Sequence, residues 1–328
     1  MRFKIVNNLP IRFHQIVQRK KIILFAIILG LTAIFILAMD KPAISKKPQE
    51  FVISAAENSI QPPAADATFA NLPAAELRAT LSRPCDFPLR SDSTLTPPFE
   101  RKIRVPVLMY HHIAIAPEAT TLPGLYHSPA IFESQLVSLQ NNCYQTVFIR
   151  DLARALDGSE SLPSQSLALT FDDGYDDIYL YAFPLLKKYQ MKGTMYIIVN
   201  ALDTPGYLTK EQVREMADSG YVEIASHTLN HANLSQSSYS QAYYQIIDSK
   251  KELEKIIGRT VDDFAYPYGY FTSRDEQLCG IAGYLSCVST YPGDVQNLLN
   301  RYSLYRLRPG YRVGPALLSW LEFVGSRR

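Results

Sequence analysis

The chain has 328 residues, enough for one large domain with extensions or for two smaller domains. Lys and Arg total 33 against 31 for Asp and Glu, so the net charge of +2 gives no reason to expect a nucleic-acid partner. The apolar fraction of 47% is ordinary for a globular protein, and the informative signals are local ones.

The N-terminal part of the chain predicts a membrane anchor. Residues 22–39 (IILFAIILGLTAIFILAM) form an uncharged apolar run long enough to cross a bilayer as a helix. Residues 1–21 carry basic and no acidic side chains, which predicts a cytoplasmic arm and an exported remainder. The expected location is the bacterial inner membrane, single-pass, with the remainder on the periplasmic or extracellular side. A cleaved signal peptide is the alternative, but no A-x-A cleavage site follows the run.

Residues 40–101 predict a linker between this anchor and a folded domain at 102–328. The segment is rich in Pro and Ala and poor in large apolar residues, a composition that disfavours long helices and central strands. The cysteines all lie on the expected exported side, where disulfides can form, and no CxxC pair indicates a cysteine zinc site. Sequence alone leaves three pairings open among Cys85, Cys143, Cys279 and Cys287.

Short apolar or β-branched runs alternate with helical stretches throughout the folded domain. Most of these runs lack polar alternation, which is typical of strands covered on both faces. The predicted strands are residues 105–110, 146–149, 167–171, 194–199, 222–226, 263–266 and 285–289. Helix starts are marked by Ser128 before a proline and by Thr209 with Gln212, and Gly258 ends a helix expected at 240–257.

This alternation predicts an α/β fold in which helices surround a parallel sheet. The number of repeats favours a closed or nearly closed barrel of about seven strands over an open doubly wound sheet, which is the alternative. The sequence has neither G-x-G-x-x-G nor a P-loop, so nucleotide binding is not expected. In such barrels the working residues lie on loops at the carboxyl ends of the strands.

Two adjacent aspartates, Asp172 and Asp173, follow the strand 167–171 in the stretch TFDDGYDD. Neighbouring side chains at a strand end point in different directions, so one carboxylate can bind a metal while the other acts as a base. Capping of the next helix is the alternative role for these carboxylates. It is the role we favour for Asp176 and Asp177.

Two histidines, His227 and His231, lie four residues apart in SHTLNH, directly after another predicted strand. One helical turn would bring both imidazoles onto one face, a workable spacing for zinc. Two histidines and one aspartate would leave a position for water, the arrangement of a catalytic zinc site. In a third motif, FAYPYG at 264–269, proline and glycine indicate a turn whose backbone N–H can act as an oxyanion donor; an ordinary loop is the alternative.

TFDDG, SHTLNH and FAYPYG, in that order and at these spacings, resemble the motifs of the polysaccharide deacetylases, carbohydrate esterase family 4, the domain shared with chitooligosaccharide deacetylases. The likeness spans about residues 103–313. It implies a distorted (β/α) barrel that removes acetyl groups from N-acetylated sugars with a divalent metal, usually zinc. At the matching positions it implies Asp172 as the base that activates water, and a backbone N–H of Tyr268 as the oxyanion donor. The implied metal ligands are Asp173, His227 and His231.

One departure from the family pattern concerns the catalytic aspartate. The third motif commonly carries an arginine that tethers this aspartate, and Ala265 stands at the corresponding position. The candidate replacements are Arg306, Arg308 and Arg312 in RLRPGYRV. Without such a cation, the pKa of Asp172 would be higher and Asp172 would be a stronger base.

A second departure concerns the proton donor. Many family members have a late histidine that protonates the leaving amine, but no histidine follows His231 here. His111 and His112 come directly after the first strand of the barrel, so one of them could reach the mouth and act as the acid; His111 is preferred. A structural imidazole packed beneath the loops is the alternative.

The resemblance predicts a metal-dependent deacetylase acting on N-acetylhexosamine units of an envelope or exported polysaccharide. Two alternatives stay open: an O-acetyl esterase on xylan or another acetylated glycan, and a non-catalytic glycan-binding or assembly protein. Sugar binding alone needs no base beside a metal, which argues against the second. Aromatic side chains that could stack on sugars at the mouth, some of them core residues instead, are Tyr110, Tyr175, Tyr207, Tyr266 and Tyr270.

Overall fold

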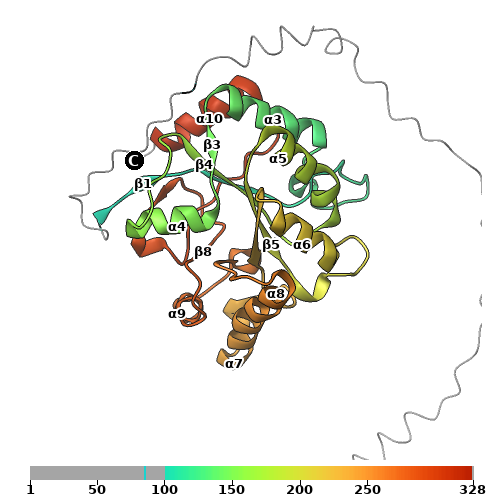
Figure 1. Cartoon of the computed structure of the whole chain (residues 1–328), viewed down its shortest axis with the longest axis vertical. Helices are drawn as coiled ribbons and strands as arrows, with labels where there is room; N and C mark the ends of the chain where they lie inside the picture. The colour runs from blue at the N-terminus through green and yellow to red at the C-terminus, as the bar shows by residue number, and fades with distance from the viewer. Residues whose placement is uncertain (1–84, 86–99, 327–328) are drawn as a thin grey trace, which may run out of the picture. The chain divides into compact units, whose positions relative to one another are not determined.

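The computed structural model describes residue 85 and residues 100–326, which form a curled sheet with helices packed around it (Figure 1). The strands are β1 (Ile103–Arg104), β2 (Val107–Tyr110), β3 (Gln145–Thr146), β4 (Ser166–Phe171), β5 (Gly193–Ile197), β6 (Val222–Ser226), β7 (Asp263–Ala265), β8 (Ser286–Val288) and β9 (Val295–Gln296). The α-helices are α3 (Pro129–Asn141), α4 (Ile149–Asp157), α5 (Phe183–Tyr189), α6 (Lys210–Asp218), α7 (Tyr239–Tyr243), α8 (Ser249–Ile257), α9 (Ser273–Ile281) and α10 (Gly314–Ser326).

The main sheet is parallel and has seven strands. Six follow the order β2-β4-β5-β6-β7-β8, and β3 pairs with the start of β4. Residues 304–307 lie in the gap between β2 and β8: Leu307 N donates to Val107 O at 2.8 Å, and Leu304 N donates to Cys287 O at 2.8 Å. The predicted α/β fold is therefore confirmed, but the sheet is a curled half-barrel. Single bridges, rather than a regular strand, join its two edges.

The predicted elements agree closely with the observed ones. Each predicted strand overlaps a strand of the sheet. Residues 146–149 run into a helix, because the Asp151 carboxylate accepts a hydrogen bond from Phe148 N at 3.1 Å and caps α4. Ser128 caps α3, and Thr209 and Gln212 form the predicted capping box of α6. The helix expected at 240–257 is α7, a π-helical turn at Tyr244–Asp248 and α8.

Side chains alternate along each strand between two buried clusters. In β4, Leu167, Leu169 and Phe171 pack among the outer helices, whereas Ala168 belongs to a cluster inside the half-barrel. The inner cluster also includes Val107, Tyr196, Ala225, Ala265, Val288, Leu304 and the α4 residues Ile149, Leu152 and Leu156. Because both faces of the sheet are covered, the sequences of its strands are nearly continuous apolar runs. A residue that continues the inner register past the end of a strand points into the mouth of the half-barrel.

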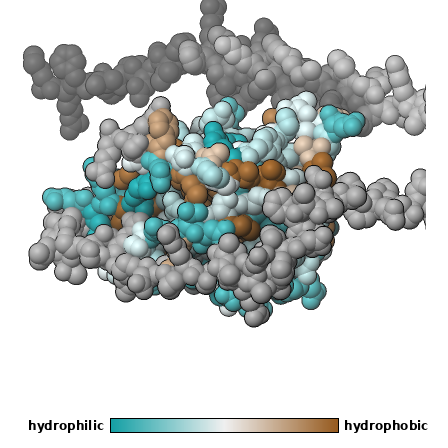
Figure 2. Space-filling model, turned by 90° about the horizontal axis from the view of Figure 1, so that it is seen from above, coloured by the Kyte–Doolittle hydropathy of each residue, from teal (hydrophilic) through white to brown (hydrophobic). Residues whose placement is uncertain are grey.

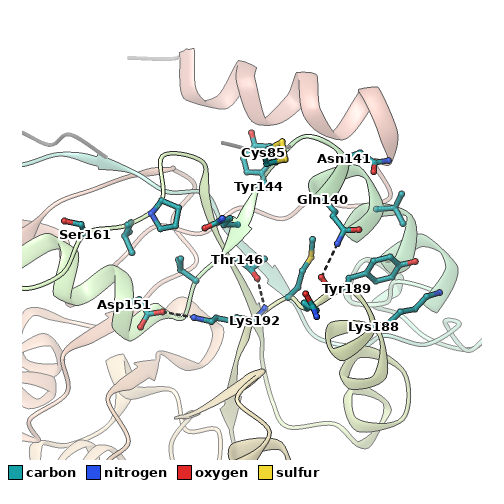
Figure 3. Close-up of a pocket in the computed structure, with 18 of the residues that line it drawn as sticks. Cys85, Gln140, Asn141, Tyr144, Thr146, Asp151, Ser161, Lys188, Tyr189 and Lys192 are labelled. Atoms are coloured by element: carbon teal, nitrogen blue, oxygen red, sulfur yellow. Dashed lines mark hydrogen bonds and ion pairs between the residues drawn. A yellow bond between two sulfur atoms is a disulfide. The ribbon is translucent and has the colours of Figure 1, made fainter. Parts of the chain in front are cut away.

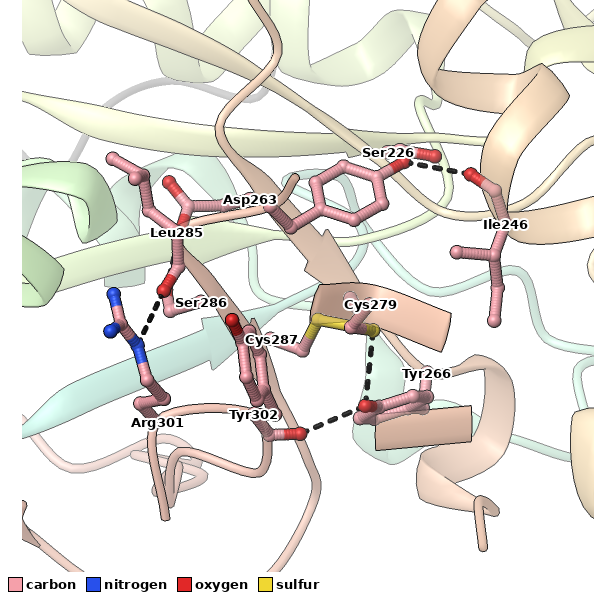
Figure 4. The surroundings of a disulfide bond; sticks show 12 residues. Ser226, Ile246, Asp263, Tyr266, Cys279, Leu285, Ser286, Cys287, Arg301 and Tyr302 are labelled. Atoms are coloured by element: carbon pink, nitrogen blue, oxygen red, sulfur yellow. Dashed lines mark hydrogen bonds between the residues drawn. A yellow bond between two sulfur atoms is a disulfide. The ribbon is translucent and has the colours of Figure 1, made fainter. Parts of the chain in front are cut away.

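Two disulfides resolve the pairing that the sequence left open. Cys85 pairs with Cys143, and Cys279 of α9 pairs with Cys287 of β8. Figure 4 shows the second bond beside the Tyr266 hydroxyl, which donates to the Tyr302 carbonyl at 2.8 Å. This disulfide therefore ties an outer helix to the sheet next to the third sequence motif.

No helix within residues 100–326 combines the length and the apolarity needed to cross a membrane. This finding contradicts the predicted inner-membrane location, which is not retained. The segments on which that prediction was based, residues 1–21 and 22–39, lie outside the described residues, as does most of the predicted linker 40–101. On the face shown in Figure 2, hydrophobic surface residues lie between hydrophilic ones.

A pair of carboxyl groups lies inside the half-barrel. Thr194 Oγ1 donates to one oxygen of Glu223 at 2.9 Å, and Ser286 Oγ donates to one oxygen of Asp263. The other oxygen of each carboxyl has no hydrogen-bond partner in the described part of the chain, although Arg150 Nη1 lies 3.6 Å from Glu223. Burial and the neighbouring carboxyl raise the pKa of Asp263 well above its usual range, and burial raises that of Glu223 to about 7.

This pair predicts that stability falls as the pH rises. Between pH 4.5, the ordinary pKa of a glutamate, and about 7, folded Glu223 keeps a proton that the unfolded chain has released. The free energy of unfolding should therefore decrease across that window by roughly 3 kcal/mol. Glu223→Gln should flatten the decrease, measured by urea unfolding at pH 5 and pH 8. Exposed Glu118→Gln is the control, and equal pH slopes in wild type and Glu223→Gln would contradict the prediction.

Candidate active site

Asp172 and Asp173 follow β4 at the mouth of the half-barrel, and both are buried. Asp172 N donates to Tyr110 O at 3.0 Å and so continues the pairing of β4 with β2. Asp172 also continues the inner register of Ala168 and Thr170. At Asp173 the backbone turns into the left-handed region, with φ at 76°, and its side chain therefore takes a different direction. The two neighbouring carboxylates have different partners.

Asp173 meets both predicted histidines. Its Oδ1 atom lies 3.4 Å from His227 Nε2 and 3.3 Å from His231 Nε2. Among the described residues, these three form a group whose possible ligand atoms all lie within 4.8 Å of one another. Asp173 Oδ1 is buried without a hydrogen-bond partner in the described part of the chain. An orphaned carboxylate oxygen facing two imidazole nitrogens fits a metal ion, which would satisfy all three atoms.

The surroundings prepare both imidazoles for metal binding. His227 Nδ1 lies 2.8 Å from the carbonyl of Ala265, so it carries the proton and leaves the Nε2 lone pair free. Burial, with His227 nearby, lowers the pKa of His231 to about 4. Its ring is therefore neutral near pH 7, the state that a metal ligand requires.

The segment from His227 to His231 is a turn and not the helical turn that the spacing predicted. Thr228 and His231 have left-handed backbones, with φ at 68° and 56°. The N–H groups of Leu229 and Asn230 donate to the Gln245 side-chain oxygen at 3.0 and 3.1 Å, instead of to helix carbonyls. The two rings still meet, with centroids 4.9 Å apart.

Arg306 is the cation that the third motif lacks. Its guanidinium binds Asp172 through two parallel bonds, Nη1 to Oδ1 at 2.7 Å and Nη2 to Oδ2 at 2.8 Å, and only 1% of Arg306 is exposed. Its Nε atom donates to Ser289 O at 2.8 Å. Burial alone would raise the pKa of Asp172, but Arg306 holds it below its usual range. Of the other two candidates, Arg308 is exposed and Arg312 donates to Pro309 O at 2.9 Å.

His111 and His112 have different surroundings. Val107 belongs to the inner cluster, so alternation along β2 directs His111 into the mouth, where its Nε2 atom lies 3.9 Å from Asp172 Oδ2. Burial lowers the pKa of His111. His112 instead stacks between Tyr126 and Tyr175, with centroids 4.1 and 3.7 Å away.

The contact that fixes His112 shows that the helix-capping role predicted for Asp177 was wrong. Asp177 does not cap a helix: its carboxylate lies 2.6 Å from His112 Nδ1 and accepts from Ile113 N at 3.0 Å. His112 Nδ1 and the backbone N–H of Ile113, in the loop after β2, both need a hydrogen-bond acceptor, and the Asp177 carboxylate supplies it. Of the two histidines, His111 alone faces the aspartates of the mouth.

Tyr268 lies in the turn of the third motif with φ at 60°. Its ring is 58% exposed and meets His231 edge-on at 4.4 Å. The left-handed conformation of Asp173, His231 and Tyr268 costs on the order of 1–3 kcal/mol at each non-glycine residue. Such strain is maintained only where the surrounding structure fixes the backbone; three of the seven non-glycine residues with this conformation in the described part of the chain are predicted site residues.

The tyrosines considered for sugar stacking separate into two groups. Tyr110 and Tyr266 are fully buried core residues. Tyr175 stacks on His112 and meets Tyr207 at 5.1 Å, so these rings pack within the loops. Tyr270 is 58% exposed and lies 6.2 Å from the Tyr268 ring, centroid to centroid. Of the five, only Tyr270 has an exposed ring, and that ring is connected to His231 through Tyr268.

A pocket of about 1150 Å³ lies away from these residues (Figure 3). Its lining comes from the segments that precede β3, β4 and β5, including Tyr144, Pro163 and Lys192. These segments lie at the amino ends of parallel strands, whereas the aspartates and histidines lie at the carboxyl ends. The pocket is therefore separate from the candidate active site.

Comparison with known proteins gives consistent results. The family model described as polysaccharide deacetylase matches residues 159–285. YxkH of Bacillus subtilis strain 168, a polysaccharide deacetylase by name, is 32% identical over 225 residues, which cover 68% of this chain and 78% of that protein. The poly-β-1,6-N-acetyl-D-glucosamine N-deacetylase of Escherichia coli K12 is 36% identical over 111 residues, 29% of this chain and 16% of that protein.

A solved structure shares the fold. The deacetylase PplD of Streptococcus pyogenes, in complex with acetate, superposes with a TM-score of 0.63 at 30% identity, covering 67% of this chain and 99% of that one. The predicted resemblance is thus confirmed by sequence and by structure. With a relative 32% identical along 78% of that relative's length and a solved deacetylase of the same fold, this chain belongs to the polysaccharide deacetylases.

Proposed function

We propose that the protein is a metal-dependent deacetylase that removes N-acetyl groups from N-acetylhexosamine units of a polysaccharide. The observation that carries the proposal is the arrangement at the mouth, where Asp172, fixed by Arg306, lies beside the group Asp173, His227 and His231. The relative from Escherichia coli, named for N-deacetylation of poly-β-1,6-N-acetyl-D-glucosamine, supports this substrate class. Two nitrogen ligands and one carboxylate favour zinc among divalent metals.

In this proposal each side chain has one task. A divalent ion held by Asp173, His227 and His231 would supply Lewis acidity towards the acetyl carbonyl and towards water. Asp172 takes a proton from the attacking water, and the two bonds from Arg306 keep it ionised and correctly directed. The backbone N–H of Tyr268 donates to the developing oxyanion, which can stabilise the transition state by about 3 kcal/mol.

The leaving nitrogen needs a proton before it departs as an amine. His111 is the nearest imidazole to Asp172 outside the metal-binding group, at 3.9 Å. We assign it the role of general acid, which replaces the late histidine that this chain lacks. His112, fixed in an aromatic stack, has no part in this step.

The metal ligands provide the first test. Asp173→Asn should reduce bound zinc to background and abolish acetate release, because the orphaned oxygen would lose its charge. Asp172→Asn should keep the metal but lower turnover by about 10²–10⁴-fold. Metal content by elemental analysis and acetate release from N-acetylglucosamine oligomers and from acetylated xylan are the measurements, with Asp176→Asn as the matched control.

Three outcomes would count against the proposal. Wild-type metal content in Asp173→Asn would remove the ligand assignment. Acetate from xylan alone would indicate an O-acetyl esterase. Bound metal without acetate from either substrate would indicate a glycan-binding protein.

The Arg306–Asp172 pair provides a second test. Arg306→Met leaves a buried carboxylate without its cation, so the free energy of unfolding should fall by about 3–5 kcal/mol. Combination with Asp172→Asn should recover most of that loss, because no charge is then left unpaired. Arg308→Met, at an exposed position two residues away, is the control for urea unfolding. Equal stability of the Arg306→Met and Arg308→Met variants would remove the pair from the proposal.

A third test concerns the proton donor. His111→Gln should leave bound zinc unchanged while lowering kcat by about 10²–10⁴-fold, the usual contribution of a general acid. His112→Gln, which alters the adjacent imidazole, should affect thermal stability more than kcat. Full activity in His111→Gln would dismiss its role as the acid.

A further inference from the structure

Helix α7 has exposed aromatic rings on its outer surface. Tyr239 is 55% exposed and Tyr243 is 41% exposed. They are four residues apart, and their ring centroids lie 6.4 Å from one another at an angle of 31°. Tyr244, in the next turn, is 53% exposed. The proposed reaction uses none of these rings, and a hydrophobic core does not need them.

The stretch of chain that carries these rings is uncharged, and the charged residues that follow it pair with each other: Lys251, near Tyr243, lies 2.9 Å from Asp248. From Ala232 to Ile247 the sequence has no acidic or basic side chain. The exposed neighbours of the rings are serines and glutamines: Ser235, Gln236, Ser238, Ser240 and Gln241. Tyrosine rings among neutral hydrogen-bonding side chains match the surface of a sugar, which has apolar C–H faces and hydroxyl edges.

This helix is fixed to the metal-binding loop. Gln245, in the π-helical turn that continues α7, accepts the N–H groups of Leu229 and Asn230 within the segment between the two histidine ligands. Gln245 is buried, and Ala242 on the inner side of α7 belongs to the core. These contacts therefore fix the position of the α7 tyrosines relative to His231.

A second connection joins α7 to the third motif. Arg274, in the first turn of α9, donates to Leu234 O at 2.7 Å and to Ser237 O at 2.8 Å, just before α7 begins. Figure 1 shows α7 and α9 as neighbours. Four residues before Arg274 is Tyr270, whose exposed ring pairs with that of Tyr268 beside His231. Exposed tyrosine rings thus lie both near His231, at Tyr268 and Tyr270, and on α7. The loops around the proposed metal site hold α7 in place.

We propose that Tyr239 and Tyr243 form an auxiliary binding surface for an uncharged N-acetylhexosamine chain, which engages sugar units remote from the unit being deacetylated. The inference rests on the proposed function, since it takes the substrate to be a polymer. Deacetylation converts a neutral amide into an ammonium ion. Residues 232–247 have no carboxylate to bind that ion, and the carboxylate of Asp248 next to them already pairs with Lys251 at 2.9 Å, so the rings favour acetylated chain over deacetylated product.

The test compares short and long substrates in the full chain with bound zinc. The double variant Tyr239→Ala/Tyr243→Ala should raise KM for a long N-acetylglucosamine polymer by about tenfold, as expected for two lost stacking contacts. Its kcat on that polymer, and both kinetic constants on a trisaccharide, should stay as in wild type. The Phe double variant keeps both rings and should behave as wild type, and Tyr181→Ala removes an exposed ring elsewhere.

A binding assay separates failure of this inference from failure of the proposed function. In affinity electrophoresis the uncharged polymer should retard the wild type more than the alanine double variant, and the deacetylated polymer should retard the two equally. Retardation without any acetate release would contradict the proposed function alone. An unchanged KM for the polymer, or equal retardation of wild type and double variant by the uncharged polymer, would overturn the inference and leave the deacetylase proposal intact.

Discussion

The bidentate contact between Arg306 and Asp172 is the interaction on which the site depends. A carboxylate with 3% exposure cannot stay ionised without a compensating charge, and the guanidinium supplies that charge with a defined direction. Once Asp172 is fixed, its neighbour Asp173 can turn towards the histidines. The two adjacent carboxylates therefore have different partners. In the family pattern the arginine lies in the third motif; here it comes from the segment that bridges the edges of the half-barrel.

The sequence predicted the strands, and it predicted that the proposed site residues lie together, because both depend on local patterns. Apolar runs identified every strand of the sheet, and the position of Asp172, Asp173 and His227 after such runs placed them at one edge. The choice among three arginines was not predictable, because residues 304–307 make isolated bridges and do not form a regular strand. Leu304 and Arg306 nevertheless show the alternation that places both inside. That spacing is the signal that could have identified Arg306.

Two features could not be predicted from periodicity. The segment 227–231 has the spacing of a helical turn, but Gln245, a distant residue, takes its N–H groups and holds a turn instead. Asp177 looked like a helix cap, and a loop from β2 uses it to fix His112. In both cases a tertiary hydrogen bond overrides a local preference, because buried backbone groups must find partners wherever the fold supplies them.

The place of Arg306 after all the other site residues in the sequence has a consequence for biosynthesis. During translation, β2 to β8 and all the predicted metal ligands leave the ribosome before residues 304–307 do. Until then Asp172 lacks its cation, and the gap between β2 and β8 has no bridge. The nascent sheet is therefore electrostatically incomplete. Asp172 becomes fixed only once residues 304–307 have been made, so a shorter nascent chain can bring Asp173, His227 and His231 together while Asp172 still lacks its partner.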